Sequence, residues 1–267
     1  MNFVTTSQGI GQVLSGEAAI LDLQAESWLE LLQEPDWRDG LEKVDIRKRI
    51  PLSALEVYAP ITPRDFWLVG SNYPGRGKSG SEEPSFFLRS SSSLSGPGSA
   101  VRINEGWGFD FDAEIAVVIG APTYRVKDRD AWSHIAGYTG CNDMTAREFL
   151  QNGRGAAVAK SYPGFGALGA SLRIVDADPG PLNISLEIDG KVWQEGVTSD
   201  MLYSISELVA KLSYSCPLRP GDVIATGAPS RTKSEPPIAL GTTMRLHVDG
   251  VMPLETRVEE AASWLDE

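Results

Sequence analysis

Histidine and cysteine are scarce in this chain of 267 residues, and their scarcity argues against several kinds of site. The two histidines, His134 and His247, do not lie among cysteines or acidic residues at the spacing of zinc ligands. The two cysteines, Cys141 and Cys216, are expected to be reduced, buried thiols. No G-x-S-x-G pattern is present, which argues against a serine hydrolase triad.

A basic excess and long apolar runs are also missing. Lys and Arg number 24 against 36 Asp and Glu, and the resulting formal charge of −12 argues against nucleic-acid and anionic-membrane partners. A locally positive site can still bind an anionic substrate. No apolar run approaches the ~20 residues of a membrane span, and residues 1–14 lack the pattern of a signal peptide. We therefore expect a cytoplasmic protein.

The apolar and turn residues predict a β-rich α+β chain with few helices, divided near residue 60. Residues 1–60 are expected to form a small N-terminal α/β lobe, and residues 61–267 a larger domain. Asp189-Gly190 and Asp249-Gly250 each predict the turn of a hairpin, and the capping-box pattern Ser204–Glu207 predicts a helix to about Ser213. Further elements are expected at 12–14, 18–23, 66–69 and 223–226 (strands) and around 26–33 (a helix).

Two glycine-rich stretches need an interpretation. Residues 164–169 match G-x-G-x-x-G, but a proline-containing segment precedes them and a strand pattern follows, so they do not predict a dinucleotide site. Residues 75–98 are rich in Gly, Ser and charge. Such a segment is either a plain surface loop or an active-site lid.

Three carboxylates alternate along a predicted strand that then becomes wholly apolar. Asp110, Asp112 and Glu114 are spaced by two, so they would share one face and repel one another. A hard dication such as Mg²⁺ would compensate this repulsion, with Asp112 and Glu114 as ligands and Asp143 as a third. The alternative is that Asp143 only caps a helix and that the acids form a solvated edge.

Two basic residues lie close to Asp143 in the sequence. Arg147 follows it by four residues, one helical turn, and would lie on the same side of the expected helix. Lys160 stands among small and apolar residues without an adjacent acid, and its simplest interpretation is a solvated loop lysine.

Taken together and in order, eight stretches resemble the fumarylacetoacetate hydrolase family. They are VGSNY (69–73), EEPSFFLRS (82–90), GPG (96–98), DFDAEIAVVIG (110–120), GYTGCNDMTAREF (137–149), AKSYPGFGALG (159–169), DGKVWQEGVTSDMLYSISELV (189–209) and LRPGDVIATGAPS (218–230). The resemblance implies a mixed β-sandwich roll with a small N-terminal lobe, usually in a homodimer.

The resemblance also implies roles for particular residues. Asp112, Glu114 and Asp143 fall on the family's metal positions, where Asp112 replaces a more usual glutamate; the ion would be Mg²⁺, or Mn²⁺ or Ca²⁺. Lys160 falls on the active-site lysine. The residues expected to contact a small anionic 2-oxo or diketo acid are Arg147, Arg76, Tyr73 and Thr226.

Two departures from the family pattern bear on the reaction. Family hydrolases carry a His/Glu pair in the lid that activates water, but the corresponding residues here are Arg76 and Ser79, and arginine stays protonated. Glu82 or Glu83 would have to serve as the base. Ala228 also stands where a substrate-contacting threonine is usual.

Three functions follow from these expectations. The first is metal-dependent C–C bond hydrolysis of an acylpyruvate-like acid through a metal-stabilised enolate. The second is decarboxylation or keto–enol isomerisation, which the loss of the water-activating pair favours. The third is a non-catalytic 2-oxo acid binder, against which the retained acids and cations argue.

Overall fold

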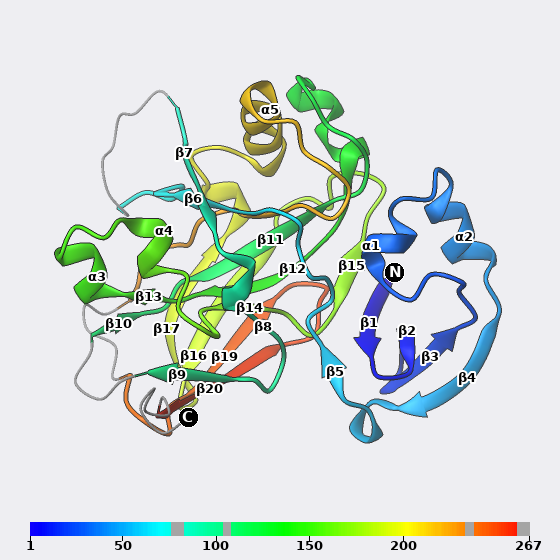
Figure 1. Cartoon of the computed structure of the whole chain (residues 1–267), viewed down its shortest axis with the longest axis horizontal. Helices are drawn as coiled ribbons and strands as arrows, with labels where there is room; N and C mark the ends of the chain where they lie inside the picture. Colours follow the sequence, from blue (N-terminus) through cyan, green and yellow to red (C-terminus); the bar gives the residue numbers. More distant parts are fainter. Residues whose placement is uncertain (76–82, 104–107, 233–237, 261–267) are drawn as a thin grey trace.

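Two β-sheets dominate the computed structural model, which describes residues 1–267 except 76–82, 104–107, 233–237 and 261–267 (Figure 1). The large sheet has the order β4-β3-β2-β1-β15-β12-β11-β18-β6-β7, with β5, β8 and β14 attached beside it. The second sheet has the order β17-β16-β19-β20-β9, and β10 pairs with β13 alone. The predicted β-rich α+β class is confirmed.

The first 60 residues contain β1 (Asn2–Thr6), β2 (Gly9–Leu14), β3 (Glu17–Leu21), α1 (Trp28–Leu31), α2 (Trp37–Lys43), β4 (Ile46–Pro51) and β5 (Val57–Tyr58). The rest of the large sheet is β6 (Phe66–Gly70), β7 (Ser85–Arg89), β8 (Leu94–Ser95), β11 (Ala113–Ile119), β12 (Ile135–Asp143), β14 (Gly166–Leu168), β15 (Leu172–Ile174) and β18 (Val223–Ala225). The second sheet comprises β9 (Ala100–Ile103), β16 (Asn183–Ile188), β17 (Lys191–Val197), β19 (Thr243–Val248) and β20 (Leu254–Glu260). The remaining elements are β10 (Phe109–Asp110), β13 (Thr145–Ala146), α3 (Arg147–Gln151), α4 (Ala156–Ala159) and α5 (Ile205–Ser215).

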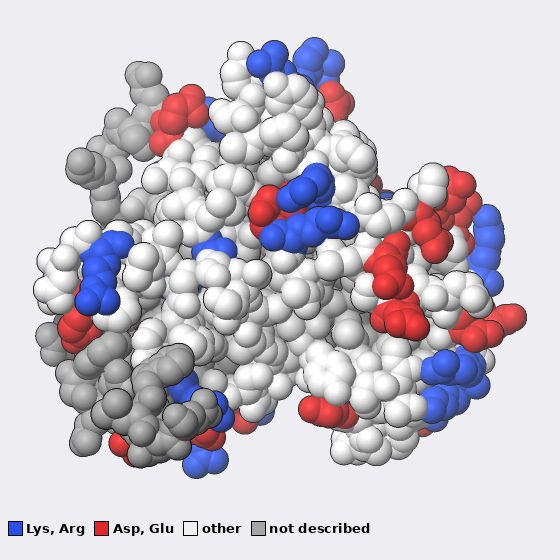
Figure 2. Space-filling model, in the orientation of Figure 1, with Lys and Arg blue, Asp and Glu red and all other residues white. Residues whose placement is uncertain are grey.

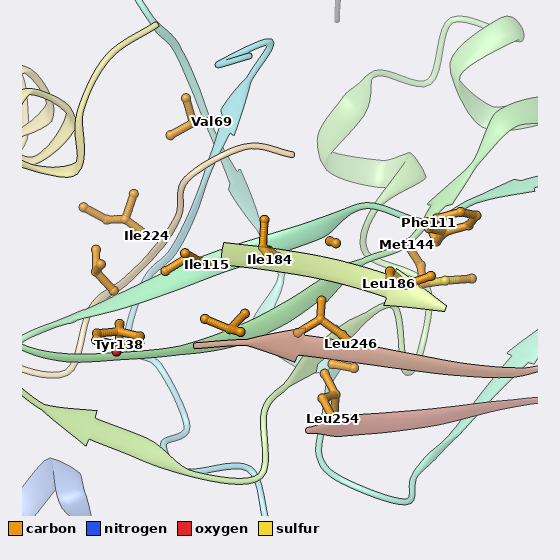
Figure 3. Close-up of a cluster of buried hydrophobic side chains, with 14 of the residues drawn as sticks. Val69, Phe111, Ile115, Tyr138, Met144, Ile184, Leu186, Ile224, Leu246 and Leu254 are labelled. Carbon is orange, nitrogen blue, oxygen red and sulfur yellow. The ribbon is translucent and has the colours of Figure 1, made fainter. Parts of the chain in front are cut away.

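Strand β11 is buried on both faces, which explains why its residues after Glu114 are all apolar. Ile115 and Val117 belong to a core that also includes side chains of the second sheet, such as Leu186 (Figure 3). Ala116 and Val118 belong to a separate core on the opposite face, shared with side chains of the N-terminal elements. The central sheet is therefore held between two apolar layers.

The N-terminal elements extend the large sheet. Strand β1 pairs with β15, and the Arg38 guanidinium donates to the carbonyl oxygens of Ile135 and Val175 at 2.6 and 2.8 Å. Figure 1 shows these elements grouped at the right, and Figure 2 shows Asp and Glu side chains gathered over them. The division into two domains near residue 60 stays a prediction.

Several local predictions are confirmed. The Asp189-Gly190 turn, with both residues at positive φ, joins β16 to β17, and Asp249-Gly250 lies between the paired strands β19 and β20. Helix α5 begins after Ser204 with the full capping box and continues to Ser215. The helix expected around 26–33 is shorter, Trp28–Leu31.

Three further expectations concern the thiols, membrane spans and the segment 75–98. Cys141 and Cys216 are free thiols. Among the helices that the structure describes, none is both long and apolar enough to cross a bilayer. Within 75–98, residues 76–82 lie outside the described residues, while β7, β8 and the short 3-10 turn Ser91–Ser93 occupy most of the remainder.

Candidate active site

The acidic stretch bends instead of forming one strand. β10 ends at Asp110 and β11 begins at Ala113, so the expectation that three acids share one continuous strand is wrong. Glu114 lies opposite Cys141 in the β11–β12 ladder, and the Asp143 amide donates to the Asp112 carbonyl oxygen at 2.8 Å. This register places Asp112, Glu114 and Asp143 on the same face, at the end of the two strands.

Asp110 is bound by two arginines. Arg147 Nη2 and Arg231 Nη1 both donate to its Oδ1, the latter at 2.5 Å. Burial raises the pKa of Asp110, but these hydrogen bonds and charges outweigh it, so the carboxyl titrates below its ordinary value. Asp110 is therefore an anchor for two guanidinium groups. The expectation that Arg147 shares a helix face with Asp143 is also wrong, because α3 begins only at Arg147.

Arg231 was not singled out from the sequence, where it is one arginine in a loop. Its Nη2 donates to the Phe111 carbonyl oxygen at 2.7 Å and lies 3.5 Å from Asp112 Oδ1. The guanidinium also lies over the Phe111 ring, 4.8 Å from the centroid. Arg231 thus holds the bend that joins Asp110 to Asp112. The side chain of Gln194 also contacts Asp112, at 3.3 Å.

Asp143 is the last residue of β12 and is 1% exposed, so the alternative that it only caps a helix is wrong. Arg89 Nη2 donates to Asp143 Oδ1, and Lys160 Nζ donates to Oδ2. Lys160 also donates to Thr145 Oγ1 at 2.9 Å, and its side chain is 12% exposed, so it is not a solvated loop lysine. Arg89 is fully buried and was missed, since one arginine in an apolar strand carries no local signal.

Glu114 is the acid whose negative charge is least neutralised by neighbouring cations. It is 3% exposed, and the Gly227 amide donates to its Oε2 at 2.8 Å. Burial raises the pKa of Glu114 to about 8, with a further contribution from the negative charges of Asp143 and Asp112, while Lys160 opposes the shift. The three carboxylates are therefore close enough to repel one another, and an added cation would relieve this repulsion.

The chemistry of this acid set fits a hard dication, which prefers carboxylate oxygens. Within the described residues, no three Asp, Glu, His or Cys side chains converge as they stand to hold an ion. At Asp143, Arg89 and Lys160 each donate to one of the two carboxylate oxygens. An ion bound there would share these oxygens with the two cations, because each oxygen has a second lone pair.

Tyr73 projects a buried hydroxyl near Glu114. The residue is 3% exposed, and its hydroxyl has no hydrogen-bond partner in the described part of the chain. Burial, together with the negative charge of Glu114, raises the pKa of Tyr73 far above its usual value and keeps the phenol protonated. Such a donor is available to a ligand oxygen.

The backbone around Tyr73 is held firmly. The Asn72 side chain donates to the carbonyl oxygens of Tyr203 and Thr226 at 3.0 and 2.8 Å and accepts from the Tyr203 amide at 2.9 Å. Ser71 takes a φ of +57°, a conformation that non-glycine residues adopt only when their surroundings enforce it. The direction of Tyr73 is therefore determined by its neighbours.

Of the four other residues expected at the site, the structure describes two, Thr226 and Glu83, and both side chains bond elsewhere. Thr226 is fully buried and its hydroxyl donates to the Ile115 carbonyl oxygen at 2.9 Å. The Glu83 side chain is 73% exposed and accepts from Lys211 Nζ of α5 at 2.9 Å. Arg76 and Glu82 lie outside the described residues.

Fold and site together define a β-rich protein with a cluster of carboxylates and cations at the ends of central strands. The family profile described as fumarylacetoacetate (FAA) hydrolase C-terminal matches residues 66–259. The chain belongs to the fumarylacetoacetate hydrolase family. Members of this family act on small organic acids and typically use a divalent metal ion.

Sequence relatives include isomerases, decarboxylases and tautomerases. The chain is 36% identical over 187 residues to the 4-hydroxyphenylacetate degradation bifunctional isomerase/decarboxylase of Escherichia coli, covering 68% of this chain but only 43% of that enzyme. It is 35% identical over 190 residues to the human mitochondrial oxaloacetate tautomerase FAHD2A, covering 67% of this chain and 60% of the relative.

Solved structures match almost the whole chain. A probable 2-hydroxyhepta-2,4-diene-1,7-dioate isomerase from Mycobacterium abscessus superposes with a TM-score of 0.85, at 29% identity and 98% coverage of both chains. A maleylpyruvate hydrolase from Sphingobium superposes with a TM-score of 0.80, at 25% identity, with 98% of this chain and 100% of that one covered. These matches confirm the predicted fold.

Proposed function

We propose that this protein is a divalent-metal-dependent enzyme that catalyses keto–enol isomerisation, or the related decarboxylation, of a 2-oxo acid. The observation that carries the proposal is the buried group of Asp112, Glu114 and Asp143 beside Lys160 and the Tyr73 hydroxyl, which has no hydrogen-bond partner among the residues that the structure describes. The three acids would hold Mg²⁺, or Mn²⁺ or Ca²⁺, and the ion would act as a Lewis acid towards the substrate's 2-oxo group.

The chain's own side chains have separate tasks in this reaction. Lys160 and Arg147 supply positive charge for the substrate carboxylate. Tyr73, which stays protonated, would donate a hydrogen bond to the 2-oxo oxygen and stabilise the negative charge of an enolate there. Burial of the acids and of Tyr73 excludes water, which strengthens each of these contacts.

Isomerisation is supported over the hydrolysis that we expected first. Hydrolysis needs an activated water, but the lid histidine is absent from the sequence and Glu83 is paired with Lys211 at an exposed position. The relatives named as isomerase/decarboxylase and oxaloacetate tautomerase favour chemistry without water. Hydrolysis remains the second candidate because a maleylpyruvate hydrolase shares the fold. The homodimer and the cytoplasmic location stay predictions.

The first test is thermal stability with Mg²⁺ and oxalate, a mimic of the pyruvate enolate. We expect an increase in Tm that requires both additives and is absent in Glu114→Gln, which keeps the side-chain volume but weakens the metal site. Glu255→Gln, at an exposed ion pair with Arg245, is the matched control and should respond like the unmodified protein. No shift with any divalent metal would contradict the proposal.

The second test identifies the reaction in the metal-loaded protein. Enol decay followed in the ultraviolet reports isomerisation, pyruvate formation from oxaloacetate reports decarboxylation, and two acids from an acylpyruvate report hydrolysis. We expect the first or second activity to exceed the third. An enzyme that only hydrolyses acylpyruvates would show that the missing lid pair has been replaced by other residues.

A further inference from the structure

Gln194 places a fully buried side-chain amide beside Asp112. Its Oε1 accepts from the Ala113 amide at 2.7 Å, and its Nε2 donates to the Pro229 carbonyl oxygen at 2.6 Å and to Asp112 Oδ1 at 3.3 Å. Turning the amide over would put donor against donor at Ala113 and acceptor against acceptor at the other two contacts. The orientation of the Gln194 side chain is therefore determined by its three partners.

A β-bulge directs this side chain towards the site. Leu186 of β16 lies opposite Gln194 of β17. The next residue of β16, Glu187, lies opposite Val192, so Trp193 has no counterpart in the ladder. Trp193 and Gln194 are both buried, whereas regular alternation would turn one of them to the other face. Bulges occur beside active sites, where they re-aim a side chain. The second sheet thus contributes a residue to a site whose acids lie at the ends of β11 and β12.

The three contacts of this amide join the two segments that hold proposed metal ligands. The Asp112 carboxylate and the Ala113 amide belong to the bend that leads into β11. The Pro229 carbonyl oxygen belongs to the loop in which the Gly227 amide donates to Glu114 Oε2 at 2.8 Å. One side chain of the second sheet therefore fixes the bend and the loop relative to each other.

A neutral amide suits a residue that orients a metal ligand. Its N–H can hold a carboxylate oxygen in place without neutralising the negative charge that attracts the ion. Arg231 also approaches Asp112 Oδ1, at 3.5 Å. The contribution of Gln194 differs because it carries no charge and because it also bonds to the backbone amide that follows Asp112. It therefore constrains both the carboxylate and the backbone from which the carboxylate extends.

We propose that Gln194 is a positioning residue for metal binding, which holds the Asp112 carboxylate in one orientation for a divalent ion. This inference rests on the proposed function, because it takes Asp112 and Glu114 as ligands of the ion. Substitution of Gln194 leaves every acid of the site in place. Metal binding should therefore weaken through the loss of orientation alone.

Titration calorimetry with Mg²⁺ alone, in the absence of substrate, tests this role. Gln194→Met keeps the length of the side chain but removes its donors and its acceptor, and it should weaken Mg²⁺ binding at least about tenfold. Ser213→Ala is the matched control. Ser213 is also fully buried, and its hydroxyl accepts from the Val126 amide and donates to the Ala210 carbonyl oxygen, within and beside α5. Its loss should lower stability and leave Mg²⁺ affinity unchanged.

A second variant and a kinetic measurement complete the test. Gln194→Asn, which serves if Gln194→Met does not fold, has an amide one methylene shorter that cannot make all three contacts, so its Mg²⁺ binding should also be weaker. In the isomerase or decarboxylase assay, the Mg²⁺ concentration for half-maximal rate should rise with the Kd. The kcat at saturating Mg²⁺ should recover, because Gln194 acts on a ligand of the ion.

The outcomes distinguish this inference from the proposed function. If the unmodified protein binds no divalent metal, both fail. If the unmodified protein binds Mg²⁺ and the Gln194 variants bind it equally well, only the inference about Gln194 is overturned. It is likewise overturned if Ser213→Ala weakens Mg²⁺ binding as much, which would indicate a general loosening of the fold, or if kcat stays low at saturating Mg²⁺.

Discussion

Replacing Asp143 with alanine is expected to lower the free energy of unfolding by about 3–5 kcal/mol and to abolish metal-dependent ligand binding. The loss of stability arises because Arg89, which is fully buried, and Lys160 would both lose their carboxylate partner. From the sequence alone we would expect the fold to tolerate this change, and the structure revises that expectation. Urea denaturation measures the effect.

A double variant tests the cause of this loss. Adding Lys160→Met to Asp143→Ala removes one of the unpaired cations and should restore part of the stability but none of the ligand binding. Asp39→Ala, which breaks an exposed pair with Lys43, is the control and should change stability little, because solvent screens the pair. A stability change at Asp143 as small as that of the control would show that the buried ion pairs are not formed in solution.

Tyr73→Phe is expected to reduce the isomerase or decarboxylase activity by about two orders of magnitude and to leave stability unchanged or slightly higher. The hydroxyl has no partner in the described part of the chain, so its removal breaks no internal hydrogen bond and relieves the cost of burying an unpaired polar group. The fall should appear in kcat, because the hydrogen bond to the 2-oxo oxygen strengthens as charge develops there.

Tyr138→Phe is the matched control for this prediction. Its hydroxyl is also in a largely buried residue, but it donates to the Asp249 carbonyl oxygen at 3.0 Å. Its removal should therefore cost about 1 kcal/mol of stability and leave kcat unchanged. If Tyr73→Phe behaved like Tyr138→Phe, with lower stability and full activity, the phenol would have a structural role and not a catalytic one.

Local patterns in the sequence were sufficient for much of the fold and part of the site. The Asp-Gly turns and the Ser204–Glu207 capping box depend on residues a few positions apart, and both formed as expected. The spacing of Asp112 and Glu114 likewise placed them on one face of the sheet, because side chains alternate along extended backbone.

Only the tertiary structure decided how the charges of the site are paired. Arg89 reaches Asp143 across 54 residues, and Arg231 reaches Asp110 across 121, so no local pattern could predict either contact. No local pattern predicted that Asp143 would lie in a strand or that Asp110 would bind two arginines. Alternation along a strand determines which face a side chain takes, but the charge that it meets there comes from whichever distant segments the fold packs beside it.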